Sequence, residues 1–200
     1  MRKKILIIIS IILTIVVVLQ ANNTRTSISG KIFDDVEKNY SDLMKAVDSL
    51  LQYEPGDVFY LGDDRFYLSA DNDTDINNEL LKGQLYVENN TDRNSDDGVP
   101  IAINDKYIQK SLELNGAISE ISRGKNVIDF VGDDLVCDQP NKFCGFYYSR
   151  YGEPQITRFF EGESLKKDGE GWVYIPDKKH NRYYTEKIKD YMYYYEGEYQ

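Results

Sequence analysis

Hydrophobic residues form a long run near the start of the chain. In Ile5–Leu19 every position is apolar except Ser10 and Thr14, and none is charged. Residues 2–4, directly before this run, are all basic. Basic residues followed by an apolar segment are typical of a chain that is inserted into a membrane with its basic flank in the cytoplasm. We therefore predict that residues 5–21 contact the membrane and that the rest of the chain lies on the far side.

The length of this segment leaves two fates open. As a helix, the run Ile5–Leu19 would span about 22 Å, less than the hydrocarbon core of about 30 Å, which favours a cleaved signal. Signal cleavage needs small residues just before the cut, and Val18 and Gln20 are not small. We predict an uncleaved single-pass anchor over residues 1–21 in the cell membrane, with an extracellular C-terminal domain. The alternative is a protein that is secreted after signal cleavage.

A periodic pattern of apolar residues starts at Ile32 and continues to Leu51. Apolar side chains recur there at steps of three and four with charged residues between them, and the pattern ends before Pro55-Gly56. This spacing predicts an amphipathic helix whose apolar stripe packs on a core. Residues 22–30 are polar and show no periodicity, so we predict a stalk there and one folded domain over residues 31–200.

Later segments alternate short apolar or aromatic runs with turn residues, which is the pattern of β-strands. Apolar spacing predicts one further, shorter helix over Asn104–Asn115. The strands that we predict are 57–61 paired with 65–69, 84–88, 117–122 paired with 127–131, 143–149, 172–175, 182–185 and 191–199. Because the strands are mostly late and do not alternate with helices, the expected fold class is α+β with an antiparallel sheet.

The charge balance excludes one class of partner. The chain has 34 acidic and 24 basic residues, a net charge of −10. Nucleic-acid binding relies on Lys and Arg against phosphate, so we predict no nucleic-acid partner. An acidic domain does not attract anionic lipid headgroups either, so the apolar segment alone would hold it to a membrane.

The chain has two cysteines, Cys137 and Cys144, separated by a short segment. In an exported protein, a pair that closes a short loop is typical of a disulfide, and we predict this bridge. The alternatives are two buried thiols or a redox pair, although redox pairs usually have the closer Cys-x-x-Cys spacing.

Candidate catalytic and metal-binding groups are few. Asp and Asn alternate in residues 71–75 and 92–98, as in calcium loops, but an EF-hand would need Gly and Glu where Ile76 and Lys82 stand. The single histidine, His180, lies in a polar segment. We therefore predict no metal site, no catalytic residue and no cofactor. The acidic loops are interpreted as solvated turns, with weak calcium binding as the alternative.

Tyrosine is the most unusual feature of the predicted domain, because most of the 17 tyrosines lie from Tyr147 onward. In the last strand, alternation would put Tyr191, Tyr193 and Tyr195 on one face and Met192 and Tyr194 on the other. Tyrosine supplies apolar contact area and a polar hydroxyl, which suits recognition of a protein or a glycan. The candidate binding residues are Tyr147, Tyr151, Tyr191 and Tyr193. The alternative is that these rings pack across strands within the sheet.

Four segments of the C-terminal third carry a resemblance. Residues 144–149 read Cys-Gly-Phe-Tyr-Tyr-Ser, 168–172 read Asp-Gly-Glu-Gly-Trp, 183–188 read Tyr-Tyr-Thr-Glu-Lys-Ile, and 193–196 read Tyr-Tyr-Tyr-Glu. This combination resembles uncharacterised exported proteins of Gram-positive bacteria, which join a short membrane or signal segment to a C-terminal domain ending in an aromatic-rich strand. The resemblance implies a bacterial surface location and no particular activity.

These patterns favour a non-catalytic module of the cell envelope that binds an envelope protein or glycan. The alternative is a secreted or tethered carboxylate-dependent hydrolase acting on envelope polymers, because a glycosidase needs only two acids at the right separation and the chain has 34. A pilin-like assembly subunit is disfavoured, because the apolar run contains no Glu and residues 22–30 interrupt any continuous helix.

Overall fold

The computed structural model describes residues 28–62, 83–89, 101–114, 118–132, 142–157, 164–175 and 182–198. Several predictions lie outside these residues, namely the membrane segment 1–21, most of the stalk 22–30, the strand 65–69, both acidic loops, Cys137 and His180. Within the described part, neither helix combines the length and the apolar character that crossing a bilayer requires.

The first described element, α2 (Ile28–Leu50), is the amphipathic helix that the apolar spacing predicts. Its side chains Val36, Leu43, Val47 and Leu50 are all buried, and they lie one or two turns apart on a single stripe. The helix begins at Ile28, so residues 28–30 are helical although we predicted them as part of the stalk.

The second described helix, α3 (Lys106–Leu112), is shorter than the predicted range of 104–115. It begins after Asp105, whose carboxylate accepts hydrogen bonds from the backbone N–H groups of Tyr107 at 2.9 Å and Ile108 at 3.1 Å. These bonds satisfy donors that a helix start leaves without partners. Because the preceding residue caps the helix, the helix cannot extend back to Asn104.

In the part of the chain that the structure describes, ten strands form one antiparallel sheet. They are β1 (Asp57–Leu61), β2 (Leu85–Asn89), β3 (Ile101–Ile103), β4 (Ile118–Arg123), β5 (Val127–Gly132), β6 (Lys142–Ser149), β7 (Lys166–Asp168), β8 (Gly171–Tyr174), β9 (Arg182–Lys189) and β10 (Met192–Glu198). Their order across the sheet is β3-β2-β1-β4-β5-β6-β10-β9-β8-β7. Every pair joins neighbours along the described chain except β1–β4 and β6–β10.

The predicted fold class, α+β with an antiparallel sheet, is confirmed. The hairpin predicted over 117–122 and 127–131 is β4–β5, in which Ile121 stands opposite Phe130. The strand predicted over 182–185 continues to Lys189 as β9. The three-residue strands β3 and β7 were not predicted.

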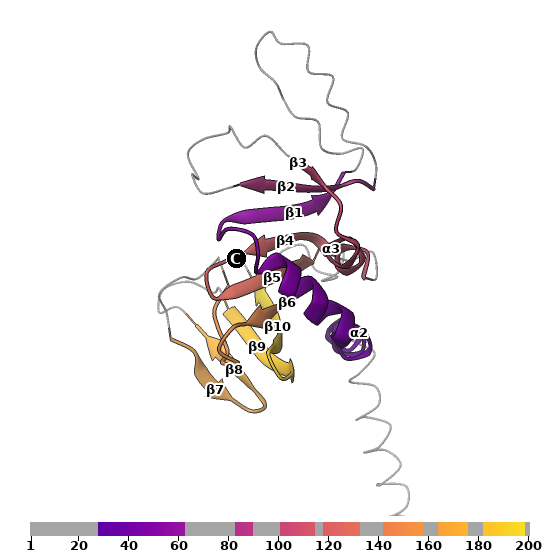
Figure 1. Cartoon of the computed structure of the whole chain (residues 1–200). Coiled ribbons are helices and arrows are strands. Elements are labelled where there is room, and N and C mark those ends of the chain that lie inside the picture. Colours follow the sequence, from indigo (N-terminus) through magenta and orange to yellow (C-terminus); the bar gives the residue numbers. More distant parts are fainter. Residues whose placement is uncertain are drawn as a thin grey trace, which may run out of the picture.

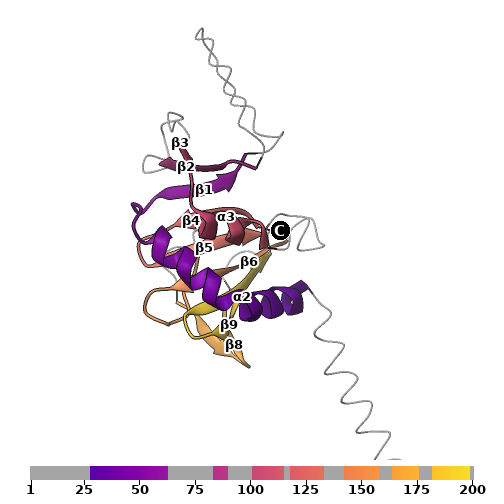
Figure 2. The ribbon, with the colours of Figure 1, turned by 45° about the vertical axis from the view of Figure 1, so that its right-hand side comes forward.

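Both helices cover the same face of the sheet, where α2 and α3 lie side by side (Figure 1). The view turned by 45° shows α2 running past β6 and β9 (Figure 2). The main core lies between these layers and includes Val36, Leu43, Phe59, Phe130 and Phe146. On the surface, the Lys110 ammonium of α3 contacts the Asp42 carboxylate of α2 at 2.5 Å.

Residues 192–195 alternate between the two faces in β10 as predicted, but Tyr191 lies in the turn before the strand and contacts Tyr148 of the main core, so it does not share the face of Tyr193 and Tyr195. Met192 and Tyr194 belong to the main core under the helices, whereas Tyr193 and Tyr195 belong to a second cluster. Because successive residues of a strand point to opposite faces, this second cluster lies on the face away from α2 and α3.

Candidate binding site

Five buried aromatic residues make up the second cluster, which we call the tyrosine cluster: Phe143, Tyr147, Tyr183, Tyr193 and Tyr195. They come from β6, β9 and β10, which are adjacent in the sheet. The rings of Tyr147 and Tyr193 stack with their centres 5.3 Å apart, and those of Tyr183 and Tyr195 with theirs 6.0 Å apart. In each stacked pair the two rings cover apolar surface of one another on the sheet face that lies away from α2 and α3.

The four tyrosines that we predicted as a binding surface do not form one exposed patch. Tyr147 is 0% and Tyr193 is 1% exposed, whereas Tyr151 is 65% and Tyr191 is 44% exposed. Tyr147 and Tyr193 therefore cannot offer their rings to a surface partner, and the alternative of packing within the sheet is correct for these two. The centre of the Tyr191 ring lies 5.9 Å from the centre of the Tyr148 ring, at the turn of the β9–β10 hairpin.

A chain of hydrogen bonds joins this cluster to the segment that follows β6. The Gln155 N–H donates to the Tyr147 hydroxyl at 2.8 Å, and this hydroxyl lies 2.9 Å from the Thr185 hydroxyl. Thr185 donates its own hydrogen to the Tyr194 carbonyl at 2.8 Å. Since a hydroxyl has only one hydrogen, Tyr147 must be the donor to Thr185. Each group in this chain therefore donates to the next, in the order Gln155, Tyr147, Thr185 and the Tyr194 carbonyl.

Three further hydroxyl groups bond the same segment. Tyr183 donates to the Gln155 carbonyl at 3.2 Å, and Tyr193 donates to the Gly152 carbonyl at 2.5 Å. Ser149, at the end of β6, donates to the Glu153 carbonyl at 2.6 Å. We call residues 150–157 the pinned segment. The tyrosine rings therefore build the sheet face while their hydroxyls hold the backbone of the pinned segment over it.

The pinned segment forms one wall of an open hollow of about 290 Å³, which we call the Trp172 hollow. Leu165 and Trp172 complete its described lining. The lining residues described are Glu153, Pro154, Gln155, Ile156, Leu165 and Trp172. A second, much smaller depression lies between α2 and α3 and includes Asp42 and Lys110, which already contact each other.

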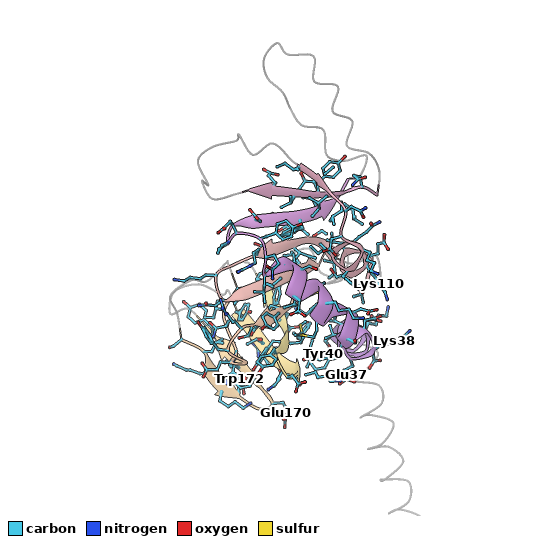
Figure 3. The ribbon with its side chains drawn as sticks, viewed as in Figure 1. Glu37, Lys38, Tyr40, Lys110, Glu170 and Trp172 are labelled. Carbon is cyan, nitrogen blue, oxygen red and sulfur yellow. The ribbon has the colours of Figure 1, made fainter. Side chains whose placement is uncertain are left out.

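The indole of Trp172 is half-buried, and two neighbours fix it. The Lys167 ammonium from β7 lies 3.8 Å from the ring centre, and the Tyr193 ring approaches edge-on with its centre 6.2 Å away. A cation over an aromatic face is an attractive contact of about 0.5–1 kcal/mol at an exposed site. Figure 3 shows Trp172 at the β7–β8 end of the sheet, close to Glu170.

The ionisation of the tyrosines limits what this site can do chemically. Burial raises the pKa of Tyr147 and of Tyr183 well above the usual value of 10. Burial also raises the pKa of Tyr193, with a further contribution from the nearby Glu153 carboxylate. These hydroxyls are therefore neutral at physiological pH, so they serve as hydrogen-bonding groups and not as phenolate nucleophiles.

Carboxylates are scarce around the hollow. Among its described lining residues only Glu153 carries one, and glycoside hydrolysis normally uses two carboxylates about 5–9.5 Å apart. Asp129 is buried on the same side of the sheet, opposite Tyr147 in the β5–β6 register, and raises the pKa of Tyr147 and Tyr183. The described residues contain no group of three or more His, Cys, Asp or Glu side chains placed to hold a metal ion.

Cys144 is buried in β6 on the helix side of the sheet. Its predicted partner, Cys137, lies outside the described residues, so the Cys137–Cys144 disulfide stays a prediction.

Sequence analysis missed the residues that line the hollow. Trp172 was assigned only to a strand, and Glu153 and Ile156 were not singled out. The available signals were that Trp172 is the only tryptophan of the chain and that Gly152-Glu153-Pro154 lies two residues after the aromatic strand β6. Comparison with protein-family models, curated proteins and solved structures finds nothing that matches this chain.

Proposed function

We propose that this protein is a membrane-anchored, extracytoplasmic binding module of the bacterial envelope, and that its ligand binds in the Trp172 hollow. Residues 5–21 would hold it in the cell membrane, and the acidic α+β domain would lie outside. The ligand would be a component of the surrounding envelope. The pattern of a basic flank and an apolar run supports the anchor, and the geometry of the hollow supports the binding role.

The single observation that carries the binding role is the build of the hollow. It combines one aromatic side chain, three further apolar ones (Pro154, Ile156 and Leu165) and two polar ones around an open space of about 290 Å³. Binding sites for small ligands combine apolar surface with a few fixed polar groups, and the lining of this hollow contains both kinds of side chain. Tyrosine hydroxyls hold the pinned segment in place before a ligand binds, so little conformational entropy of this segment is lost on binding.

The hydrolase alternative receives less support. Glu153 has no second carboxylate among the described residues of the hollow, and the neighbouring tyrosine hydroxyls are neutral. A binding role uses Glu153 as a hydrogen-bond acceptor and needs no partner acid.

The anchor is tested by expressing the tagged full-length chain in a Gram-positive host and separating membranes from culture medium. The proposal expects the protein in the membrane fraction with the intact mass of the uncleaved chain. A shortened product in the medium would overturn the anchored form of the proposal.

The binding role is tested by sedimenting the purified full-length chain with isolated Gram-positive cell walls. We expect Trp172→Ala to lose most of the wall-bound fraction. The matched control is Tyr174→Ala, which removes a half-buried aromatic residue of the same strand that also packs on the tyrosine cluster but does not line the hollow. Equal sedimentation of Trp172→Ala and the unmodified protein would exclude the hollow as the binding site.

A further inference from the structure

The lining of the Trp172 hollow combines apolar and polar side chains, and this combination selects a ligand class. We infer that the hollow takes an N-acetylated amino-sugar unit of an uncharged polysaccharide, an inference that rests on the proposed binding function. Such a unit combines an apolar C–H face, a methyl group, an amide N–H and several hydroxyls. Each of these groups has a counterpart in the hollow.

The apolar side of the hollow consists of Trp172, Leu165 and Ile156. A planar indole offers a flat apolar surface on which the C–H face of a sugar ring can lie. Lys167 and Tyr193 already hold the indole in place, so the ring need not be ordered when the sugar binds. Ile156 and Leu165 are the counterparts of the acetyl methyl group.

The polar side is formed by Glu153 and Gln155 of the pinned segment. An ionised carboxylate only accepts hydrogen bonds, so Glu153 calls for a ligand with donors, such as an acetamide N–H and sugar hydroxyls. The side-chain amide of Gln155 both donates and accepts. The backbone N–H and carbonyl of Gln155 are bonded to Tyr147 and Tyr183, which fixes the position from which this side chain extends.

The size and charge of the hollow argue against other ligands. A volume of about 290 Å³ is at the small end for ligand sites, which fits one sugar ring of a longer polymer. Glu153 is the one charged residue of the described lining, and the chain has a net charge of −10, so a phosphate-rich polymer is disfavoured even with the Lys167 ammonium over the Trp172 ring. Addition of an extended peptide next to Trp172 is blocked because β8 is paired with both β7 and β9, and the edge strand β7 is only three residues long.

The single tryptophan makes this inference measurable, because all indole emission comes from Trp172. The full-length chain, purified in detergent, is titrated with three tetrasaccharides of the same linkage: the β-1,4 tetramers of N-acetylglucosamine, of glucosamine and of glucose. We expect the acetylated tetramer to shift the Trp172 emission at concentrations about tenfold or more below those of the glucose tetramer, because glucose lacks the acetyl methyl group that Ile156 and Leu165 would contact.

A conservative substitution tests the role of the carboxylate. Glu153→Gln should weaken binding of the acetylated tetramer about tenfold, because it removes the charge of the acceptor. The matched control Glu170→Gln changes an exposed acid of the β7–β8 turn outside the hollow lining and should leave binding within about twofold. Both positions are exposed, so the variants should fold, which circular dichroism verifies.

The remaining outcomes separate this inference from the proposed function. Equal binding of the glucose and acetylated tetramers, or tighter binding of the cationic glucosamine tetramer, would overturn acetamide recognition. If none of the three shifts the emission while Trp172→Ala still abolishes sedimentation with cell walls, the sugar inference fails and the binding module stands. If Trp172→Ala sediments normally, the proposed function itself fails.

Discussion

Tyrosine has two separate tasks in this molecule at the scale of single residues. The rings of Tyr147 and Tyr193 pack inside the sheet face, and their hydroxyls reach out to the backbone of the pinned segment. Phenylalanine could do the first task but not the second. A buried polar group must find a partner, so each hydroxyl is placed where the pinned segment supplies a backbone N–H or carbonyl.

Removing one hydroxyl at the centre of this arrangement should be costly. In Tyr147→Phe, the Gln155 N–H and the Thr185 hydroxyl each lose a partner in a buried environment. We expect the free energy of unfolding to fall by about 1–3 kcal/mol, measured by urea denaturation. Tyr151→Phe, at a side chain that is 65% exposed, should change it by less than about 0.5 kcal/mol. Similar values for the two variants would contradict the structural role of the Tyr147 hydroxyl.

The residue pattern predicted part of this arrangement. Alternation in the last strand correctly separated Tyr193 and Tyr195 from Met192 and Tyr194. It could not show that the tyrosine face is covered, because the cover is the pinned segment. That segment contains Gly152 and Pro154 and has neither helical nor strand periodicity. Its position depends on hydrogen bonds to residues far along the chain, which no local pattern records.

At the scale of elements, α2 is stabilised by its buried stripe more than by its surface charges. The Asp42 carboxylate contacts the Lys110 and Lys45 ammonium groups, and these two hydrogen bonds lower its pKa to about 2. All three groups are exposed to solvent, where ion pairs contribute little to stability. The buried stripe contributes more, because the apolar side chains of Val36, Leu43, Val47 and Leu50 leave water where the helix packs on the sheet.

A pair of substitutions on α2 separates these contributions. Leu43→Ala leaves a cavity under the helix, and we expect it to lower the free energy of unfolding by about 2–5 kcal/mol. Lys38→Ala, on the exposed side of the helix (Figure 3), should change it by less than about 0.5 kcal/mol. Thermal or urea unfolding measures both. A loss of under 1 kcal/mol in Leu43→Ala, below the range of about 2–5 kcal/mol given by cavity costs, would show that α2 does not pack as described.

Elements with strong internal patterns were predictable, and those defined by their neighbours were not. The stripe of α2 and the β4–β5 hairpin carry their own periodicity and turn residues. By contrast, β7 reads Lys-Lys-Asp, all exposed, and is a strand because it pairs with β8. The pairing of β6 with β10 joins segments that are far apart in sequence, so sequence periodicity could not predict the order of the sheet.

The molecule as a whole should be sensitive to alkaline pH. Burial raises the pKa of Tyr147, Tyr183 and Tyr194 above 10 in the folded chain, so these residues ionise first in the unfolded chain. The stabilisation that comes from burying these tyrosines in their neutral form is therefore complete below pH 10 and is lost as the pH rises above 10. Each such tyrosine should lower the free energy of unfolding by about 1.4 kcal/mol per pH unit above that point.

Urea denaturation at a series of pH values, followed by circular dichroism, measures this dependence. The ultraviolet absorption of tyrosinate, recorded on the folded chain, should show Tyr147, Tyr183 and Tyr194 ionising only at a pH well above 10. A free energy of unfolding that stays constant through about pH 11 would contradict the burial of these hydroxyls.

In the proposed function, the tyrosine cluster forms the binding site indirectly, by holding the pinned segment beside Trp172. The most direct test is the wall-bound fraction of two variants that each remove one hydroxyl, Tyr193→Phe and Tyr191→Phe. Tyr193 donates to the Gly152 carbonyl from inside the sheet, whereas Tyr191 is 44% exposed beside it. We expect Tyr193→Phe to bind walls less well and Tyr191→Phe to bind normally. Loss of binding in Tyr191→Phe alone, or in neither variant, would contradict the account.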